Sequence, residues 1–422
     1  MELYNTLSRR LEPFAPAGPA ATLYVCGVTP YDTSHLGHAR TYVVFDLLQR
    51  YLRYRGHAVR YVQNVTDVDD DILRKAREVG TPYDELAEIN LAIFRTDMEA
   101  LNVLPPAVWP RATGDVPAMV EIVQALVEQG SAYERGGNVY FRVGAAHDFG
   151  ALSRLSRDEM IARLREEKFD PDDPRKENPL DILMWQAKAP GEPSWPSPWG
   201  EGRPGWHIEC TALALKYLGD TIDVHGGGGD LLFSHHESER AQAETYTGVQ
   251  PFVRFWMYAG TVYLGAEKMS KSLGNLILVR DLLKRYSADA VRLYLAREHY
   301  RTPLVYDERQ LAEAEEQVRR LRGAVQATPL SGVGAARGGA RSALGAGTPS
   351  AARAGDGEFR ARFEAAMDAD LDTPRAADVL LELAATIESD REGGDAQAAL
   401  LVELAEVLGL RLAGQPLPVW PT

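Results

Sequence analysis

Near its start, the chain alternates between a pattern that suits strands and one that suits helices. Residues 23–28 form a short apolar, β-branched run closed by a Thr-Pro pair, which is typical of a buried strand that ends in a turn. From about residue 33 to 54 the apolar positions recur at helical spacing, with Thr33 or Ser34 as the expected N-cap. Residues 59–65 predict a second strand. Strand, helix and strand in this order predict a parallel sheet, whose ligands bind beyond the carboxyl ends of the strands.

The same strand pattern returns only after a long interruption. Residues 221–225 and 253–263 have apolar sheet character, and the first of these runs leads into a glycine-rich loop, Gly226–Asp230. Between the two blocks, from about residue 97 to 200, lie helical stretches, a possible strand and a loop rich in Pro and Trp. One nucleotide-binding domain split by an insertion explains this order better than two independent enzymes. We therefore predict an α/β protein whose catalytic domain, residues 1–285, is a split Rossmann-like parallel sheet.

The remainder of the chain has a helical pattern. Residues 286–322 include a heavily charged amphipathic helix, and residues 323–357 are rich in Gly, Ala, Ser and Pro without periodicity, which predicts a flexible linker. A last, shortened helical module is expected over residues 358–422. Between Glu358 and Arg411 it carries 13 acidic residues, 5 arginines and no lysine, a charge that suits RNA poorly.

Composition excludes several classes of protein. With 422 residues, 45% of them hydrophobic, the chain can bury the cores of two or three domains. Its formal net charge of −14 argues against general affinity for nucleic acid, although a local basic groove is allowed. No apolar run approaches membrane-spanning length, and the N-terminal residues lack an apolar leader. We therefore expect a cytoplasmic protein without membrane contact.

Only two cysteines occur in the chain, and each stands inside a polar motif. Cys26 lies in Tyr-Val-Cys-Gly and Cys210 ends Gly-Trp-His-Ile-Glu-Cys, with Ser-His-His-Glu-Ser-Glu following at residues 234–239. Thiolates are soft metal ligands, so two sulfurs, an imidazole and a carboxylate are available to one ion. A disulfide and two unrelated core residues are the alternatives. A reducing compartment weighs against the disulfide, and the polar neighbours weigh against both.

Two further motifs suit phosphate chemistry. His35-Leu-Gly-His38 stands at the predicted start of the first helix, where free N–H groups and the helix dipole favour anions and a glycine permits close approach. Lys268-Met-Ser-Lys-Ser272 places Lys268 and Lys271 on a loop of small residues, which suits stabilisation of a leaving pyrophosphate. Each motif alone also fits an ordinary surface segment. Their occurrence together strengthens both interpretations.

The two motifs resemble the HIGH and KMSKS signatures of the class I aminoacyl-tRNA synthetases, which bind and activate ATP. Other motifs narrow the resemblance to the cysteinyl-tRNA synthetase family, and it runs almost without a break from Leu3 to about Tyr306. Besides the signatures, the segments that carry it are Tyr24-Val-Cys-Gly, Asn64-Val-Thr-Asp-Val-Asp-Asp70, Pro193-Ser-Trp-Pro-Ser-Pro-Trp-Gly, Gly202-Arg-Pro-Gly-Trp-His-Ile-Glu-Cys210, His225-Gly-Gly-Gly and His235-His-Glu-Ser-Glu239.

The resemblance implies a ligase that uses ATP to join L-cysteine to tRNA(Cys) through a cysteinyl adenylate. It also implies one Zn2+ ion, which would select cysteine by its sulfur without an editing domain. The implied zinc ligands are Cys26, Cys210, His235 and Glu239. The other histidines of these motifs, His207, His225 and His236, are expected to have structural hydrogen-bonding roles.

The resemblance extends to the substrate sites. Thr66 and Trp206 match positions that line the amino-acid pocket. ATP, with Mg2+ expected beside it, would contact residues of the two signatures and of the glycine stretch. The residues implied for ATP binding and catalysis are His35, His38, Gly226, Gly227, Gly228, Asp230, Lys268 and Lys271.

The C-terminal part departs from the family pattern. Asp370-Leu-Asp-Thr-Pro-Arg375 resembles the start of the family's helical stem-contact module, but the chain stops soon after it, so the basic, aromatic anticodon domain is not expected. A mycothiol cysteine ligase, which joins cysteine to glucosaminyl-inositol, is therefore the rival interpretation. The short C-terminus, the segment Thr29-Pro-Tyr-Asp32 and Leu36 favour it, whereas Arg40, His225 and Glu239 match the synthetase. A noncatalytic zinc-binding relative is a third alternative, which the intact signatures oppose. A monomer is expected.

Overall fold

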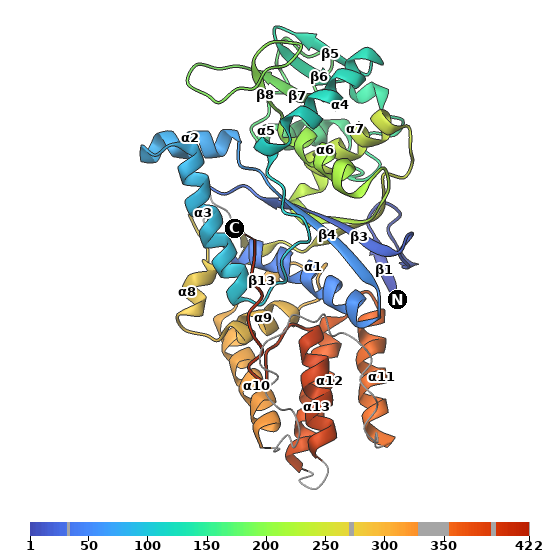
Figure 1. The fold of residues 1–422 in the computed structure, drawn as a ribbon, viewed down its shortest axis with the longest axis vertical. Helices are drawn as coiled ribbons and strands as arrows, with labels where there is room; N and C mark the ends of the chain where they lie inside the picture. The colour runs from blue at the N-terminus through green and yellow to red at the C-terminus, as the bar shows by residue number, and fades with distance from the viewer. Residues whose placement is uncertain (32–33, 270–273, 328–353, 390–393, 422) are drawn as a thin grey trace.

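A parallel sheet of four strands forms the centre of the molecule (Figure 1). The computed structural model describes residues 1–31, 34–269, 274–327, 354–389 and 394–421. The central sheet has the order β10-β9-β3-β4, and its three strand pairings are all parallel. The strands are β3 (Ala20–Val28), β4 (Ala58–Val65), β9 (Ile222–Gly228) and β10 (Val253–Ala259). Each half of the split domain therefore contributes two strands, as the hydrophobic pattern predicted.

Helix α1 (Leu36–Tyr54) connects β3 to β4 and packs against the sheet. Its apolar residues are buried over most of its length, because a stripe of helical spacing is removed from water only by docking on the strands. The N-cap is His35 and not Thr33 or Ser34. The His35 side chain caps the helix, because its Nδ1 accepts a hydrogen bond at 3.3 Å from the N–H of His38, three residues further on. Ser34 precedes the cap, and Thr33 lies outside the described residues.

The interruption between the two halves folds into helices and a separate antiparallel sheet, of order β5-β6-β7-β8 (Figure 1). A second hydrophobic core fills the space between this sheet, α4 and the two helices that follow it, α6 (Trp206–Leu218) and α7 (Glu237–Thr247). The bounds are α2 (Asp70–Val79), α3 (Tyr83–Ala100), α4 (Val116–Glu128), β5 (Ala132–Arg135), β6 (Asn138–Phe141), α5 (Arg157–Glu166), β7 (Ile182–Ala187) and β8 (Gly202–Pro204).

The C-terminal part forms a helical bundle, α10–α13, on the other side of the central sheet from the antiparallel sheet (Figure 1). Its helices are α10 (Glu308–Gln326), α11 (Ala354–Asp368), α12 (Thr373–Ser389) and α13 (Gly394–Val407), and α8 (Val279–Leu283) and α9 (Ala288–Ala296) precede them.

The predicted linker, residues 323–357, is wrong at both ends, because α10 continues to Gln326 and α11 begins at Ala354. Ala324 and Val325 are buried, so the apolar stripe of α10 extends past the point at which composition suggested a linker. Residues 328–353 lie outside the described part of the chain.

Two small sheets complete the fold. One is the hairpin of β1 (Glu2–Asn5) and β2 (Arg10–Pro13), and the other has the order β12-β11-β13. The second sheet consists of β11 (Val262–Leu264), β12 (Glu267–Lys268) and β13 (Leu304–Val305). Among the described helices, none combines the length and the apolar character needed to cross a membrane. The predicted α/β class, with a parallel sheet and a helical C-terminal region, is confirmed.

Candidate functional site

Thiol, imidazole and carboxyl side chains gather where β3, α6 and α7 meet, and we call them the donor cluster. Cys26 comes from β3 and Cys210 from the first turns of α6. His235 and Glu239 come from the turn η4 (Leu232–His236) and from α7. All four residues are buried, with at most 6% of any of them exposed. The structure thus brings together the four residues that the resemblance implied as zinc ligands.

The ligand atoms of the donor cluster are close enough to share one ion. The sulfurs of Cys26 and Cys210 are 3.7 Å apart, and the Cys26 sulfur is 3.5 Å from Glu239 Oε1. His235 Nε2 lies 3.0 Å from the same oxygen. Four sulfur-type ligands at about 2.3 Å around zinc stand about 3.8 Å apart at the edges of the tetrahedron, so the two thiols fit one shell. They are free thiols, far beyond the roughly 2.05 Å of a disulfide bond.

Burial favours the neutral forms of the two thiols and of His235. It raises the pKa of the Cys26 thiol well above its usual range and also raises that of the Cys210 thiol. It lowers the pKa of His235 well below its usual range. Neutral imidazole is the form that binds a metal, whereas a thiol must lose its proton first. A divalent cation would therefore provide the positive charge that two buried thiolates need.

Neighbouring side chains orient the donor cluster. His207 Nδ1 lies 2.9 Å from His235 Nδ1, which turns the other nitrogen of His235 toward Glu239. His225 Nε2 lies 2.9 Å from the second carboxylate oxygen of Glu239. Such hydrogen bonds fix the ring orientation of a metal ligand and tune its basicity. His207 and His225 thus each contact one residue of the donor cluster through a ring nitrogen.

A second possible ligand set was missed by the sequence analysis. Cys26, His225, His236 and Glu239 also place their ligand atoms within 4.8 Å of one another. His236 Nε2 lies 3.2 Å from the Cys26 sulfur, and its Nδ1 lies 2.9 Å from the Tyr258 hydroxyl. The adjacent histidines His235 and His236 were the sequence feature that could have indicated this second set, because either ring can face a residue one turn further along a helix. Nothing in the sequence marks Tyr258, which reaches the donor cluster only through the pairing of β10.

Both residues expected in the amino-acid pocket lie beside the donor cluster. Trp206, the first residue of α6, stacks on the His235 ring with centroids 4.2 Å apart. The Thr66 hydroxyl accepts a hydrogen bond from Asn64 Nδ2 at 3.2 Å. Asn64 Oδ1 in turn lies 3.6 Å from the Cys210 sulfur. Thr66 and Trp206, far apart in sequence, thus both lie close to residues of the donor cluster.

The two signature motifs meet at the start of α1, a region that we call the signature edge. The rings of His35 and His38 stack with centroids 3.7 Å apart. A side chain on Gly37 would stand 3.0 Å from the His35 ring and 3.5 Å from the methyl group of Met269, in the second signature. Gly37 therefore leaves room for the His35 ring, whereas an added methyl group would be in ordinary contact with Met269 of the second signature.

The glycine stretch extends β9 along the signature edge. Gly226–Gly228 pair with β10, and only the next residues, Gly229–Leu231, turn away. A side chain on Gly226 would clash with the Phe45 ring of α1, so the glycine lets the helix lie against the strand. The loop predicted from the glycines is wrong for the first three residues, because strand pairing overrides their preference for turns.

The remaining residues expected to bind ATP are only partly placed. The Asp230 carboxylate lies against Gly228, so a side chain added to Gly228 would clash with it. The Lys268 backbone pairs with Tyr263 and fixes where the second signature begins. Lys271 lies outside the described residues. A side chain added to Gly228 would stand 3.7 Å from the Thr41 hydroxyl of α1. The glycine stretch therefore lies beside the helix that the first signature begins.

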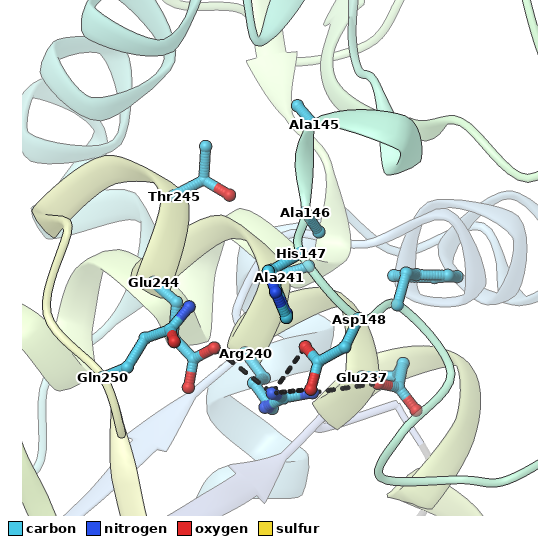
Figure 2. A pocket seen from close by; sticks show the side chains of 11 residues that line it. Ala145, Ala146, His147, Asp148, Glu237, Arg240, Ala241, Glu244, Thr245 and Gln250 are labelled. Carbon is cyan, nitrogen blue, oxygen red and sulfur yellow. Dashed lines mark hydrogen bonds and ion pairs between the residues drawn. The ribbon is translucent and has the colours of Figure 1, made fainter.

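A cavity of about 250 Å³ lies between α7 and the loop of residues 145–149 (Figure 2). Figure 2 shows the Arg240 side chain among three carboxylates. Arg240 donates to Asp148 at 2.7 and 2.8 Å and lies 3.4 Å from Glu244. These contacts pair the charge of the buried guanidinium and tie the loop that holds Asp148 to α7. We assign this cavity a structural role, separate from the donor cluster.

Comparison with known proteins decides the family. Residues 15–316 match the family described as tRNA synthetases class I (C) catalytic domain, and residues 362–413 match the DALR domain. The cysteine–tRNA ligase of Dehalococcoides mccartyi is 44% identical over 419 residues, which cover 98% of this chain and 86% of that protein. The chain belongs to the cysteine–tRNA ligase family. The family member from Alkalilimnicola ehrlichii is 46% identical over 417 residues, 97% of this chain and 85% of that protein.

Solved structures share the fold of this cysteine–tRNA ligase family member. Methionyl-tRNA synthetase of Mycobacterium tuberculosis, in complex with methionyl-adenylate, has a TM-score of 0.60 at 16% identity, covering 93% of this chain and 90% of that one. A putative arginyl-tRNA synthetase of Campylobacter jejuni has a TM-score of 0.57 at 14% identity, covering 95% of each chain. The resemblance found in the sequence is confirmed at the level of family and fold.

Proposed function

We propose that this chain activates L-cysteine with ATP to form cysteinyl adenylate and transfers the cysteine to the 3′-terminal ribose of tRNA(Cys), a step of protein biosynthesis. Family membership supports the proposal. The observation that carries it is the adjacency of the two regions along β9. His225 contacts Glu239 of the donor cluster, and the next residue, Gly226, lies against Phe45 of α1, the helix that begins at the signature edge. Activation of cysteine requires such neighbouring sites for sulfur and phosphate.

We propose Zn2+ as the ion of the donor cluster. Two thiolates, an imidazole and a carboxylate form a suitable ligand set, and their atoms are close enough for one ion. When bound, zinc would take the substrate sulfur as a ligand and so distinguish cysteine from serine by more than the roughly 1–3 kcal/mol that apolar packing of one group supplies. Thr66 and Trp206 would border the bound amino acid. The ligands would be Cys26, Cys210, His235 and Glu239.

ATP, accompanied by Mg2+, would lie across the carboxyl ends of β3 and β9. His35 and His38 would contact its phosphates at the start of α1, where N–H groups and the helix dipole attract anions. Gly226–Gly228 and Asp230 would lie beneath the nucleoside. The carboxylate oxygen of cysteine would attack the α-phosphorus in line, and pyrophosphate would leave. Little proton transfer is needed, so positioning and charge dominate catalysis.

Lys268 and Lys271 would contact the β- and γ-phosphates as pyrophosphate leaves. Replacement of Lys271 by alanine removes a charge that acts mainly in the transition state, so we expect cysteine-dependent ATP–pyrophosphate exchange to slow about 100-fold. The zinc content and the Michaelis constant for cysteine should stay unchanged, because the donor cluster is intact. An unimpaired exchange rate would refute this role of the second signature.

The exchange reaction also separates an enzyme from a noncatalytic relative, which would show none. The acceptor is tested by offering the cysteinyl adenylate either a tRNA(Cys) transcript or glucosaminyl-inositol. We expect cysteine on the tRNA, and a product only with the amino sugar would identify a mycothiol-type ligase instead. Transcripts with altered anticodons or acceptor stems then show which part of the tRNA is read.

We propose that the enzyme acts as a monomer in the cytoplasm. Its two buried cysteines are free thiols, which suits a reducing compartment. Size-exclusion chromatography with light scattering tests the oligomeric state, and a stable dimer at micromolar concentration would contradict it.

A further inference from the structure

A buried carboxylate joins the helical bundle to the segment that follows α9, residues 297–305, which we call the junction segment. Asp370 lies in the turn between α11 and α12 and is 3% exposed. Its carboxylate accepts hydrogen bonds from the Tyr300 hydroxyl at 2.7 Å and from Arg301 Nε at 2.7 Å. It also accepts one from the Tyr4 N–H at 2.8 Å. A buried charge persists only with such a set of partners, so the contact is specific in geometry as well as in charge.

The backbone of this turn is shaped to fit the junction segment. Asp370 and Leu371 have φ angles of 57° and 53°, in the left-handed region that residues other than glycine rarely adopt. His299 Nε2 donates to the Asp370 carbonyl at 3.0 Å, and Thr373 Oγ1 donates to the Ala296 carbonyl at 2.7 Å. A conformation of this kind persists where the surroundings determine it. The turn therefore does more than link two helices of the bundle.

The junction segment also holds the helix of the first signature. Arg40 lies two residues after His38, and it is 1% exposed. Its guanidinium donates to the Glu298 carbonyl at 3.0 Å and the His299 carbonyl at 2.7 Å, and it also donates to the Leu295 carbonyl. Arg40 thus closes the C-terminal end of α9 and fixes α1 against the start of the junction segment.

The same segment holds the strand that leads to the second signature. The Gly260 N–H donates to the Tyr300 carbonyl at 2.7 Å, and the Leu304 N–H donates to the Thr261 carbonyl at 2.9 Å. A side chain on Gly260 would clash with the backbone of Thr302, so the two chains are in close contact. β13 then pairs with β11, which pairs with β12 at the start of the second signature. Both signatures are thus attached to one short stretch of chain.

We propose that Asp370 is a positioning residue for the activation of cysteine. It locks the junction segment and thereby sets the two signatures relative to each other, so the helical bundle contributes to adenylation before tRNA takes part. This inference rests on the proposed function, because it presupposes that the signatures bind ATP. A misplacement of about 1 Å can cost about 100-fold in rate, so the loss of one anchor among several should cost about tenfold.

Asp370→Asn is the variant that tests the proposal. Asparagine keeps the volume and tolerates the left-handed backbone, but it loses the charge that faces Arg301. We expect the kcat of cysteine-dependent pyrophosphate exchange, measured without tRNA, to fall about tenfold. The Michaelis constant for cysteine and the zinc content should stay at the wild-type values. Tyr300→Phe, which removes one hydroxyl from the same contact, should lower kcat in the same way by a smaller factor, about threefold.

Asp378→Asn is the matched control. Asp378 lies on α12 and pairs with Arg297 of the junction segment, but its side chain is 54% exposed. The variant makes the same change of charge between the same two parts of the molecule. Because exposed ion pairs contribute little, we expect exchange within about twofold of the wild-type rate.

The outcomes separate the two proposals. A wild-type protein without exchange activity would overturn the proposed function. With an active wild type, an unchanged kcat in both Asp370→Asn and Tyr300→Phe would overturn the positioning role. A parallel loss of zinc or of cysteine affinity would also overturn it, since it would indicate general loosening of the fold. If Asp370→Asn does not fold, Tyr300→Phe at an unchanged melting temperature decides the question.

Discussion

The donor cluster and the signature edge lie along the same sheet but are built in different ways. In the donor cluster the tips of side chains from β3, α6, η4 and α7 meet, and sulfur, nitrogen and oxygen atoms stand within a few ångströms of one another. At the signature edge Gly37 leaves room for the His35 ring, and further along the same helix Gly226 lets β9 lie against Phe45 of α1. The first region depends on the chemical identity of its atoms, whereas the second depends on shape. The two regions should therefore respond differently to substitution.

The largest effect is expected from Cys210→Ser, which changes one atom of the donor cluster and almost nothing in volume. The hydroxyl is a harder ligand with a much higher pKa than the thiol, so zinc should be lost together with cysteine activation. We expect kcat/KM for cysteine in pyrophosphate exchange to fall at least about 100-fold, since even residues that only support a ligand contribute about 10- to 100-fold. Zinc content by atomic emission checks the cause. A variant with wild-type zinc content and wild-type cysteine activation would contradict the assigned site.

Substitution of the two adjacent histidines, His235 and His236, distinguishes between the two ligand sets. His235 lies 3.0 Å from Glu239 and is oriented by a neighbouring histidine, whereas His236 bridges the Cys26 sulfur and the Tyr258 hydroxyl. We therefore expect His235→Gln to lose zinc. His236→Gln should keep it with an affinity about 10- to 100-fold weaker, as for a supporting residue. Zinc competition with a chromogenic chelator measures both, and the reverse order would assign the metal to the set that contains His236.

A smaller effect is expected at the signature edge from Gly37→Ala. The added methyl group would stand 3.0 Å from the His35 ring, so the ring must shift by a few tenths of an ångström. We expect the kcat of exchange to fall about tenfold, because positioning errors well below 1 Å already matter. The zinc content should not change. Gly323→Ala, in α10 where an added side chain meets open space, is the control and should leave activity intact. A Gly37→Ala enzyme with wild-type exchange would show that close approach is dispensable there.

The difference between the regions also explains what the sequence could predict. The strands β3 and β4 follow from continuous apolar runs, because their two faces pack into the two hydrophobic cores, and the helix α1 follows from its helical period. The four residues of the donor cluster followed from the resemblance, since their spacing alone does not bring them together. The roles of Tyr258 and His236 depend on strand pairing and ring orientation, which no local pattern encodes. For the same reason the cap at His35 and the pairing of Gly226–Gly228 with β10 were missed: tertiary contacts override local preference.

The smallest effect concerns Glu167, which follows α5 beside the donor cluster. Its carboxylate accepts hydrogen bonds from the Ser234 hydroxyl at 2.5 Å and from the Ser234 N–H at 3.3 Å, and burial raises its pKa to about 7 from 4.5. The folded state therefore favours the protonated acid. Its contribution to the free energy of unfolding is complete below pH 4.5 and is lost as the pH rises toward 7.

Glu167→Gln mimics the protonated acid and can keep both contacts to Ser234. At pH 8 the variant should be more stable than the wild type by about 2 kcal/mol, after allowance for partial exposure, and at pH 4.5 the two should be equal. Melting temperatures of both proteins between pH 4.5 and 8 measure the difference, which corresponds to a few degrees. A difference that does not change with pH would mean that shape, and not charge, governs this margin of the donor cluster. The contact between Glu167 and Ser234 would then depend on shape, as the signature edge does, and only the zinc ligands themselves would depend on the chemical identity of their atoms.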